Sequence, residues 1–340
     1  GPSIPSCTLP MAGEASGGPW LHPDWISALC SGPAADWQTA PMPNVLVLGA
    51  GWVGAAVAAA ADGRADVASV LVLDPPFEPE LERRDTAATE HLRRIVADGD
   101  ILAVVNCCGR VQGTDAELDD ANHRFAEWLC DALTGTGVRL VHVGSASEYG
   151  DPASPEPVPE AAAPRPVGPY ATTKAEGTGV VLEARARGLD ATVARVFNIV
   201  GHPVPTVSPI HQWLTDLQGL DDGGEVVVWW PPTTRDFVMI EDVARALLDL
   251  ALTPAPAPPL VNVCSGVGLT FGDIVESLAA ELGVRATIRS LDRPGIEVVV
   301  GDPTLLGATT GWTPEMSAAA LAARAVGRDG ATGGAAGTSR

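Results

Sequence analysis

The fold is decided by the stretch Asn44-Val-Leu-Val-Leu-Gly-Ala-Gly-Trp-Val-Gly54. A short β-rich run leads into a glycine turn, and an alanine-rich run over 55–61 follows as a predicted helix. Glycines let backbone N–H groups approach a pyrophosphate, and the N-terminus of the next helix adds partial positive charge. A lone G-x-G-x-x-G is a weak signal, but this one follows a strand and opens a helix. We therefore expect a dinucleotide cradle. Its residues are Gly49, Gly51, Trp52, Val53 and Gly54.

The next strand, predicted over 69–73, ends at Asp74, which lies 20 residues after Gly54. A carboxylate there can accept hydrogen bonds from both hydroxyls of an adenosine ribose, and it repels a 2′-phosphate. NAD is therefore favoured over NADP, although the arginine pair just before Asp85 would accommodate a phosphate if it folded back. Asp85 itself either borders the adenine or is a solvated loop acid.

Two later strands are expected to end beside the cofactor. The run 101–105 reads as a buried strand that leads to Cys107 and Gly109, and the run 138–143 leads to Ser145. In an open parallel sheet, ligands bind at the carboxyl ends of the strands, so Ser145 is placed for chemistry. Strand and helix alternate up to about residue 200, which predicts an α/β fold with a doubly wound parallel sheet.

Tyr170 and Lys174 combine two rare residue types. The chain has two tyrosines, and Lys174 is its only lysine. Four residues make about one helical turn, so the phenol and the ammonium should lie on one helix face. A cation beside a phenol favours the phenolate and lowers a pKa that starts near 10. The simpler alternative is an ordinary aromatic–cation pair on a helix surface.

The pattern along the chain suggests four parts. Residues 1–43 form an extension to which we assign no chemistry, and residues 44–200 form the cofactor-binding domain, to which 235–265 return. The mixed segments 201–234 and 266–327 should build a smaller cap over the strand ends. The Gly/Ala-rich residues 328–340 read as a disordered tail.

The composition of the chain argues against some classes of binding partner. A net charge of −21 and a pI of about 4.5 argue against nucleic acid or an anionic membrane as the main partner. No run of about 18 apolar residues and no secretory signal is visible, so we expect a cytoplasmic protein. The six cysteines show no metal-ligand spacing, and no metal site is expected.

Taken together, the glycine turn, Asp74, Ser145 and the Tyr-x-x-x-Lys pair resemble the extended short-chain dehydrogenase/reductase family, in its NAD-dependent epimerase/dehydratase branch. Three further segments carry the resemblance. These are Arg195-x-x-Asn198-x-x-Gly201, Arg235-Asp-Phe-Val-x-Ile-x-Asp242 and Val261-Asn-Val-Cys-Ser-Gly266. The resemblance covers about residues 44–312 and implies a Rossmann-type sheet with a smaller C-terminal substrate-binding α/β cap. It also implies a homodimer.

The resemblance assigns roles to single residues. Tyr170 would be the acid/base and Lys174 would lower its pKa and bind the nicotinamide ribose, so both would also contact the cofactor. Ser145 would hold the substrate oxygen, and Asn122 would support the lysine. A nucleoside-diphosphate substrate would be contacted by Arg195, Asn198 and Arg235.

The implied function is an NAD-dependent epimerase or 4-ketoreductase that moves hydride at a ring carbon, C4, of a UDP- or dTDP-sugar in secondary metabolism. Dehydration is disfavoured, because Ala146-Ser147 replaces the Asp-Glu pair that 4,6-dehydratases place after the catalytic Ser/Thr. Two alternatives stay open at this point: a ketoreductase for a non-sugar natural-product ketone, and a non-catalytic NAD-binding sensor.

Overall fold

The computed structural model describes residues 44–62, 64–74, 86–152, 154–220, 223–253, 256–293 and 295–328. The extension 1–43, the acid Asp85 and the tail beyond Arg328 lie outside these described residues. Among the described helices, none is both long and apolar enough to cross a membrane.

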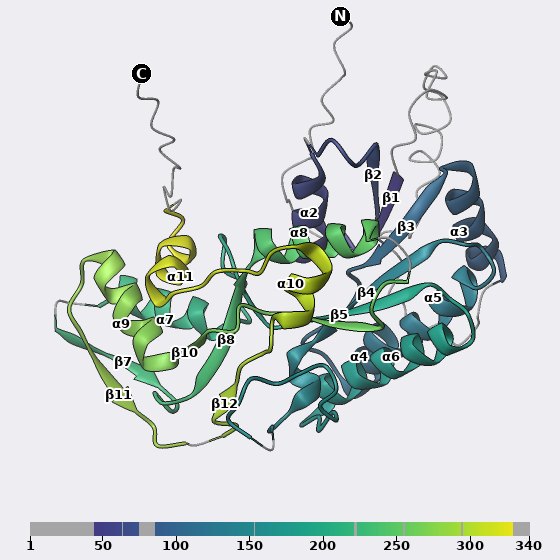
Figure 1. The fold of residues 1–340 in the computed structure, drawn as a ribbon. Helices are drawn as coiled ribbons and strands as arrows, with labels where there is room; N and C mark the ends of the chain where they lie inside the picture. The colour runs from purple at the N-terminus through teal and green to yellow at the C-terminus, as the bar shows by residue number, and fades with distance from the viewer. Residues whose placement is uncertain are drawn as a thin grey trace, which may run out of the picture. The chain divides into compact units, whose positions relative to one another are not determined.

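The largest of the sheets has six parallel strands, in the order β2-β1-β3-β4-β5-β9 (Figure 1). The order runs outward from β1 in both directions, which confirms the predicted doubly wound sheet. The strands are β1 (Asn44–Leu48), β2 (Ser69–Leu73), β3 (Ile101–Asn106), β4 (Arg139–Ser145), β5 (Ala191–Val196) and β9 (Leu260–Val263). Their residues are mostly buried because helices cover both faces.

Two apolar cores lie on the two faces of this sheet. The first includes Val47 of β1 and packs under α2 (Trp52–Ala61) and α8 (Ile240–Leu252), which contact each other. The second includes Leu46 of β1 and packs under three helices. These are α3 (Thr86–Asp98), α5 (Phe125–Leu133) and α6 (Pro169–Ala186). Neighbouring β1 residues thus face opposite cores, as the alternation of side chains along a strand requires.

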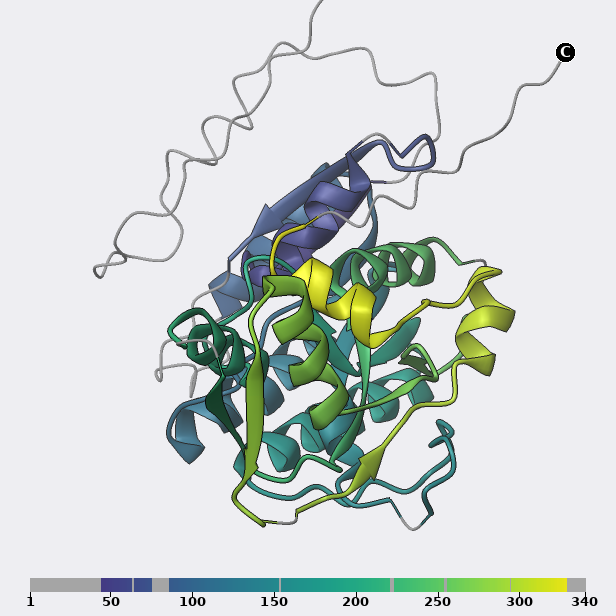
Figure 2. The same cartoon turned by 90° about the vertical axis from the view of Figure 1, so that its left-hand side faces the viewer.

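The later elements build a third core of their own (Figure 2). Strand β8 (Thr234–Met239) pairs with β6 (Asn198–Val200), β10 (Gly268–Thr270) and β12 (Val298–Val299). A separate pair joins β7 (Gly224–Val228) to β11 (Ala286–Ser290). Helices α7 (Pro209–Gln218), α9 (Phe271–Leu282) and α11 (Ala318–Ala325) supply apolar residues to this core, while α10 (Thr304–Thr310) contacts α8 and β9.

The boundary between the two halves differs from the expected one. Strand β8 lies in the smaller sheet rather than returning to the large one, and β6, which ends at residue 200, pairs with it. Only the following α8 and β9 return to the large sheet and its helices. The chain therefore crosses between the two halves at 197–198, at 239–240 and again between β9 and β10, at 264–267.

The helix expected around Asn122 is interrupted by a π-helical turn. Helix α4 (Asp115–Asp119) leads into η2 (Asp120–Arg124), and α5 continues from Phe125. Helix α6 approaches this turn closely: a Cβ added to Gly177 would lie 2.1 Å from the Asn122 carbonyl oxygen. A glycine at 177 is required for this approach. π-Turns of this kind are frequent at functional sites.

Candidate active site

The glycine turn between β1 and α2 has the geometry of a dinucleotide cradle. Gly49 has φ +96°, a conformation that favours glycine, and a Cβ added to Gly54 would lie 1.9 Å from the Gly49 carbonyl oxygen. The Ala50 N–H donates to Asp74 Oδ1 at 3.3 Å, so the acid at the end of β2 lies beside the turn. Close backbone approach, a helix N-terminus and an adjacent carboxylate fit an adenosine diphosphate.

Tyr170, Lys174 and Ser145 lie together at the carboxyl end of β4. Tyr170 and Lys174 belong to the first turns of α6, and Ser145 ends β4 and caps the short helix η3 (Ala146–Tyr149). The Ser145 hydroxyl, which hydrogen-bonds Ser147 Oγ at 2.8 Å, lies close enough to the Tyr170 phenol to lower the pKa of that phenol. Lys174 is 4% exposed and its Nζ donates to the Val143 carbonyl oxygen at 2.6 Å. The pair predicted from rare residue types is thus brought to a serine on the neighbouring strand.

The pKa of Tyr170 differs from the expectation. Burial raises it above the ordinary value, and the Glu148 carboxylate raises it further, which outweighs the hydrogen bond from Ser145. Burial disfavours the charged form of a phenol. The expected lowering by Lys174 is therefore not seen, and the phenol stays protonated at neutral pH in this structure.

Asn122 links three segments of the site. Its Oδ1 accepts from the Arg110 N–H at 2.9 Å, and its Nδ2 donates to the Arg110 carbonyl at 2.9 Å and to Thr173 Oγ1 at 3.1 Å. A Cβ on Gly109 would lie 2.9 Å from Asn122 Oδ1 and 3.8 Å from Lys174 Nζ. The loop after β3, the π-turn and α6 therefore meet at this asparagine, with Gly109 beside the lysine.

The remaining predicted cofactor residues line the same turn. Cys107 donates its N–H to the Leu48 carbonyl at 2.8 Å, and its carbonyl carbon lies 3.0 Å from where a Gly49 Cβ would be. Trp52 begins α2, and its ring lies against the backbone of Gly201. The end of β3 thus lies against the glycine turn that follows β1.

Glu148 was missed by the sequence reasoning. It is fully buried, and its two oxygens are hydrogen-bonded by Ser145, Thr178 and Arg195. The only sequence signal is an acid three residues after a serine, the capping-box spacing, which predicts one of these contacts and not the others.

Arg195 is placed differently from the prediction. It is 1% exposed, pairs with Glu148 and lies over the Tyr149 ring at 4.4 Å. A guanidinium engaged in this way inside the protein does not point at a substrate pyrophosphate. A lone arginine on a strand gives no sequence clue to the face on which it lies.

Asn198 and Arg235 lie on the smaller sheet. Asn198 is exposed and donates from Nδ2 to the Asp236 carbonyl at 2.8 Å. Arg235 is half-buried, and its guanidinium donates to the Ile296 carbonyl at 2.8 Å. Both stay candidates for substrate contact.

Asp236 is a second buried acid that the sequence reasoning did not single out. It accepts from the N–H and the hydroxyl of Ser265 and from the N–H groups of Gly266 and Gly301, at 2.7–3.2 Å. These bonds tie β8 to the loops after β9 and β12. Asp236 thereby fixes the strand that carries Arg235.

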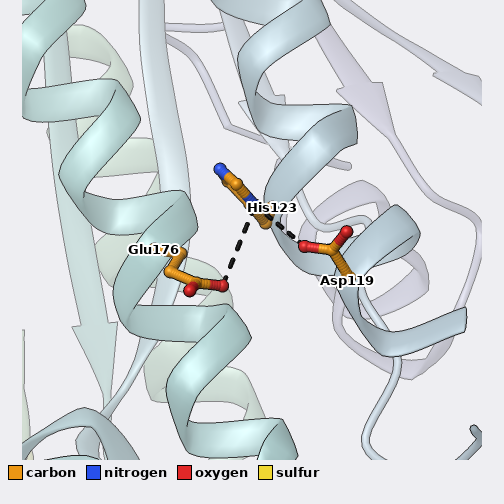
Figure 3. Close-up of side chains that lie close together, drawn as sticks. All are labelled: Asp119, His123 and Glu176. Atoms are coloured by element: carbon orange, nitrogen blue, oxygen red, sulfur yellow. Dashed lines mark hydrogen bonds and ion pairs between the residues drawn. The ribbon is translucent and has the colours of Figure 1, made fainter. Parts of the chain in front are cut away.

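Within the described residues, a surface cluster of two acids and a histidine has side chains of the types that bind metals. The ligand atoms of Asp119, His123 and Glu176 lie within 4.8 Å of one another, between the π-turn and α6 (Figure 3). His123 Nδ1 is 2.9 Å from Asp119 Oδ1, and Arg124 donates to the other Asp119 oxygen at 2.8 Å. This pairing accounts for the cluster as a surface ion network.

Comparisons with known proteins agree with this geometry. The family model described as "NAD dependent epimerase/dehydratase family" matches residues 45–264. A dTDP-6-deoxy-L-talose 4-dehydrogenase (NAD(P)(+)) from Kitasatospora kifunensis is 30% identical over 297 residues, which are 82% of this chain and 92% of that protein.

Two solved structures share the fold. A UDP-glucuronic acid 4-epimerase from Bacillus cereus matches with a TM-score of 0.71 at 17% identity, over 83% of this chain and 98% of the other. A dTDP-glucose 4,6-dehydratase from Bacillus anthracis matches with a TM-score of 0.68 at 16% identity, over 84% and 96%. Epimerase and dehydratase thus share this architecture, and the fold by itself does not choose between their reactions.

Proposed function

Because the chain belongs to the NAD-dependent epimerase/dehydratase family, we propose that it transfers hydride at C4 of a UDP- or dTDP-sugar, with Tyr170 as the acid/base. The observation that carries this proposal is that α6 packs on the end of β4, where Lys174 Nζ bonds the Val143 carbonyl at 2.6 Å, so that Tyr170 and Lys174 lie beside Ser145. Two hydroxyls that meet next to a dinucleotide cradle can hold one carbonyl or alcohol oxygen between them.

Each residue has a task in this proposal. NAD, when bound, would take up the hydride, and its reduced form NADH would supply it. Ser145 holds the substrate oxygen, and Tyr170 gives a proton to that oxygen or removes one from it. Lys174, one helical turn from Tyr170, supplies a positive charge. Asp74 binds the ribose hydroxyls, which favours NAD over NADP.

The raised pKa of Tyr170 favours one direction of reaction. A phenol that burial keeps protonated is ready to donate its proton to the oxygen of a ketone as hydride arrives. This fits the reduction of a keto-sugar, a step that a 4-ketoreductase and an epimerase share. The relative from Kitasatospora kifunensis is named a 4-dehydrogenase of a dTDP-sugar, which supports hydride transfer at C4 of such a substrate.

Dehydration lacks its acid and base in this proposal. The turn after Ser145 holds one carboxylate, Glu148, and this group is buried and bonded to Arg195. Ala146 and Ser147 offer neither a carboxylic acid nor a carboxylate for eliminating water.

Thermal unfolding with UDP and dTDP tests the substrate class. We expect one of the two nucleotides to raise Tm, because a ligand that binds the folded state stabilises it by about 2.7 kcal/mol at 100 times its Kd. Arg235→Gln should reduce this shift. Arg289→Gln is the matched control, since that arginine is an exposed cap residue paired with Glu225, and it should leave the shift unchanged. No stabilisation by either nucleotide would favour a non-sugar ketone.

A further inference from the structure

Glu148 is a buried carboxylate that the proposed mechanism leaves without a task. Its Oε1 accepts from the Ser145 N–H at 2.7 Å and from Thr178 Oγ1 at 3.1 Å. Its Oε2 accepts from Arg195 Nε at 3.0 Å and from Nη2 at 2.7 Å. A carboxylate has about four lone-pair sites, so this one is saturated. The four bonds come from the end of β4, from α6 and from β5.

These bonds join Ser145 to the helix that carries Tyr170. Tyr170, Lys174 and Thr178 are spaced four apart, so they form one stripe along α6. The stripe meets the end of β4 and the following turn at three places. Tyr170 contacts Ser145, Lys174 contacts the Val143 carbonyl, and Thr178 contacts Glu148. Glu148 therefore fixes the register between the serine and the tyrosine.

Glu148 also lies near Lys174, because Thr178, which bonds its Oε1 at 3.1 Å, is one helical turn from Lys174 on α6. Burial lowers the pKa of Lys174, and the Glu148 carboxylate is the largest influence that raises it, followed by Cys108 and Cys107. Burial raises the pKa of the Cys107 thiol to about 12 and that of Cys108 well above its ordinary value. His142, which also faces the lysine, has a pKa far below its ordinary value because it is buried. Glu148 is the one carboxylate among these influences, and its pairing with Arg195 at 2.7 Å fits the charged form.

We propose that Glu148 is a positioning residue, which holds Ser145 against the stripe of Tyr170 and Lys174 and provides the counter-charge of the lysine. Its effect on turnover rests on the proposed function, because it acts through the acid/base Tyr170. Its effect on Lys174 does not depend on any reaction.

A titration of Lys174 tests the counter-charge directly. Because Lys174 is the only lysine, protein labelled with [ε-¹³C]lysine gives a single side-chain NMR signal whose shift follows its protonation. Glu148→Gln keeps the shape and removes the charge. We expect the midpoint of the titration to move to lower pH than in the unsubstituted protein, because a neighbouring negative charge favours the ammonium form. An unchanged midpoint would overturn the proposal.

Two further variants separate charge from packing. Thr178→Val removes one hydrogen bond to Glu148 and keeps the carboxylate, so the Lys174 midpoint should stay in place. The double variant Glu148→Gln/Arg195→Met guards against misfolding, since it leaves no unpaired buried arginine. The midpoint should again lie below that of the unsubstituted protein, because the influences on Lys174 are Glu148 and the two cysteines.

Turnover gives the second readout. If Ser145 loses its register, kcat for Glu148→Gln should fall about 10²-fold while the Kd for NAD stays the same, because small misplacements of reacting groups cost about that much. Suppose that the unsubstituted enzyme shows turnover that depends on Tyr170, and that Glu148→Gln has the same kcat. This result would contradict the positioning role of Glu148 and leave the proposed function intact. If the unsubstituted protein shows no turnover that depends on Tyr170, the proposed function is contradicted. The titration of Lys174 then remains the test of the role of Glu148.

Discussion

Tyr170→Phe should lower kcat by about 10²- to 10⁴-fold while NAD still binds, because the ring keeps its shape and only the proton-transferring hydroxyl is lost. Steady-state kinetics give kcat, and calorimetric titration gives the Kd for NAD. The nearness of Ser145 is the reason to expect an effect at the upper part of this range, since in the proposed mechanism both hydroxyls would bind one substrate oxygen.

The second tyrosine is the matched control. Tyr149 is buried, and its hydroxyl donates to Asn262 Oδ1 at 2.7 Å. Tyr149→Phe should reduce stability by about 1 kcal/mol or more, because it leaves a buried acceptor with one partner fewer, and kcat should hold. Equal losses of kcat in both variants would mean that the effect comes from folding and not from proton transfer.

Arg195→Met should lower the free energy of unfolding by about 3–5 kcal/mol, because it leaves the Glu148 carboxylate buried without its ion pair. The double variant Glu148→Gln/Arg195→Met should recover most of this loss, since a neutral pair leaves no buried charge. Urea unfolding at equilibrium measures both.

The alternative for Arg195 is the substrate contact that the sequence suggested. That role predicts a different pattern: near-normal stability, a raised KM for the substrate, and no rescue by the double variant. The two sites, Arg195 and Glu148, are in direct contact, so non-additive free energies are the expected sign of a coupled pair.

The predictions for the cofactor side of the site rest on local signals. The glycine turn sets its own geometry, because a Cβ at Gly54 would collide with the Gly49 carbonyl, and this constraint is visible in the sequence as glycine spacing. Asp74 follows from its distance along the chain, since the second strand lies beside the first. The four-residue spacing of Tyr170 and Lys174 likewise needs only the helix repeat.

The missed features depend on contacts between distant segments. Glu148 binds Arg195, which lies 47 residues away, and no periodicity announces such a pair. The pKa of Tyr170 is raised mainly by burial, which depends on how α6 packs and not on its neighbour in sequence. The π-turn at Asn122 adds a residue to a helical turn without altering the apolar pattern around it, so 3.6-residue spacing gives no warning of it.

Absorbance at 340 nm tests the central claim most directly. Protein loaded with NADH is mixed with 4-keto forms of dTDP- and UDP-sugars, and Tyr170→Phe protein is treated in the same way. We predict that the absorbance falls with at least one nucleotide sugar, as hydride leaves the reduced cofactor, and that this decay is slower by about 10²-fold or more in the variant. A steady signal with every nucleotide sugar, or equal decay in both proteins, would contradict the account.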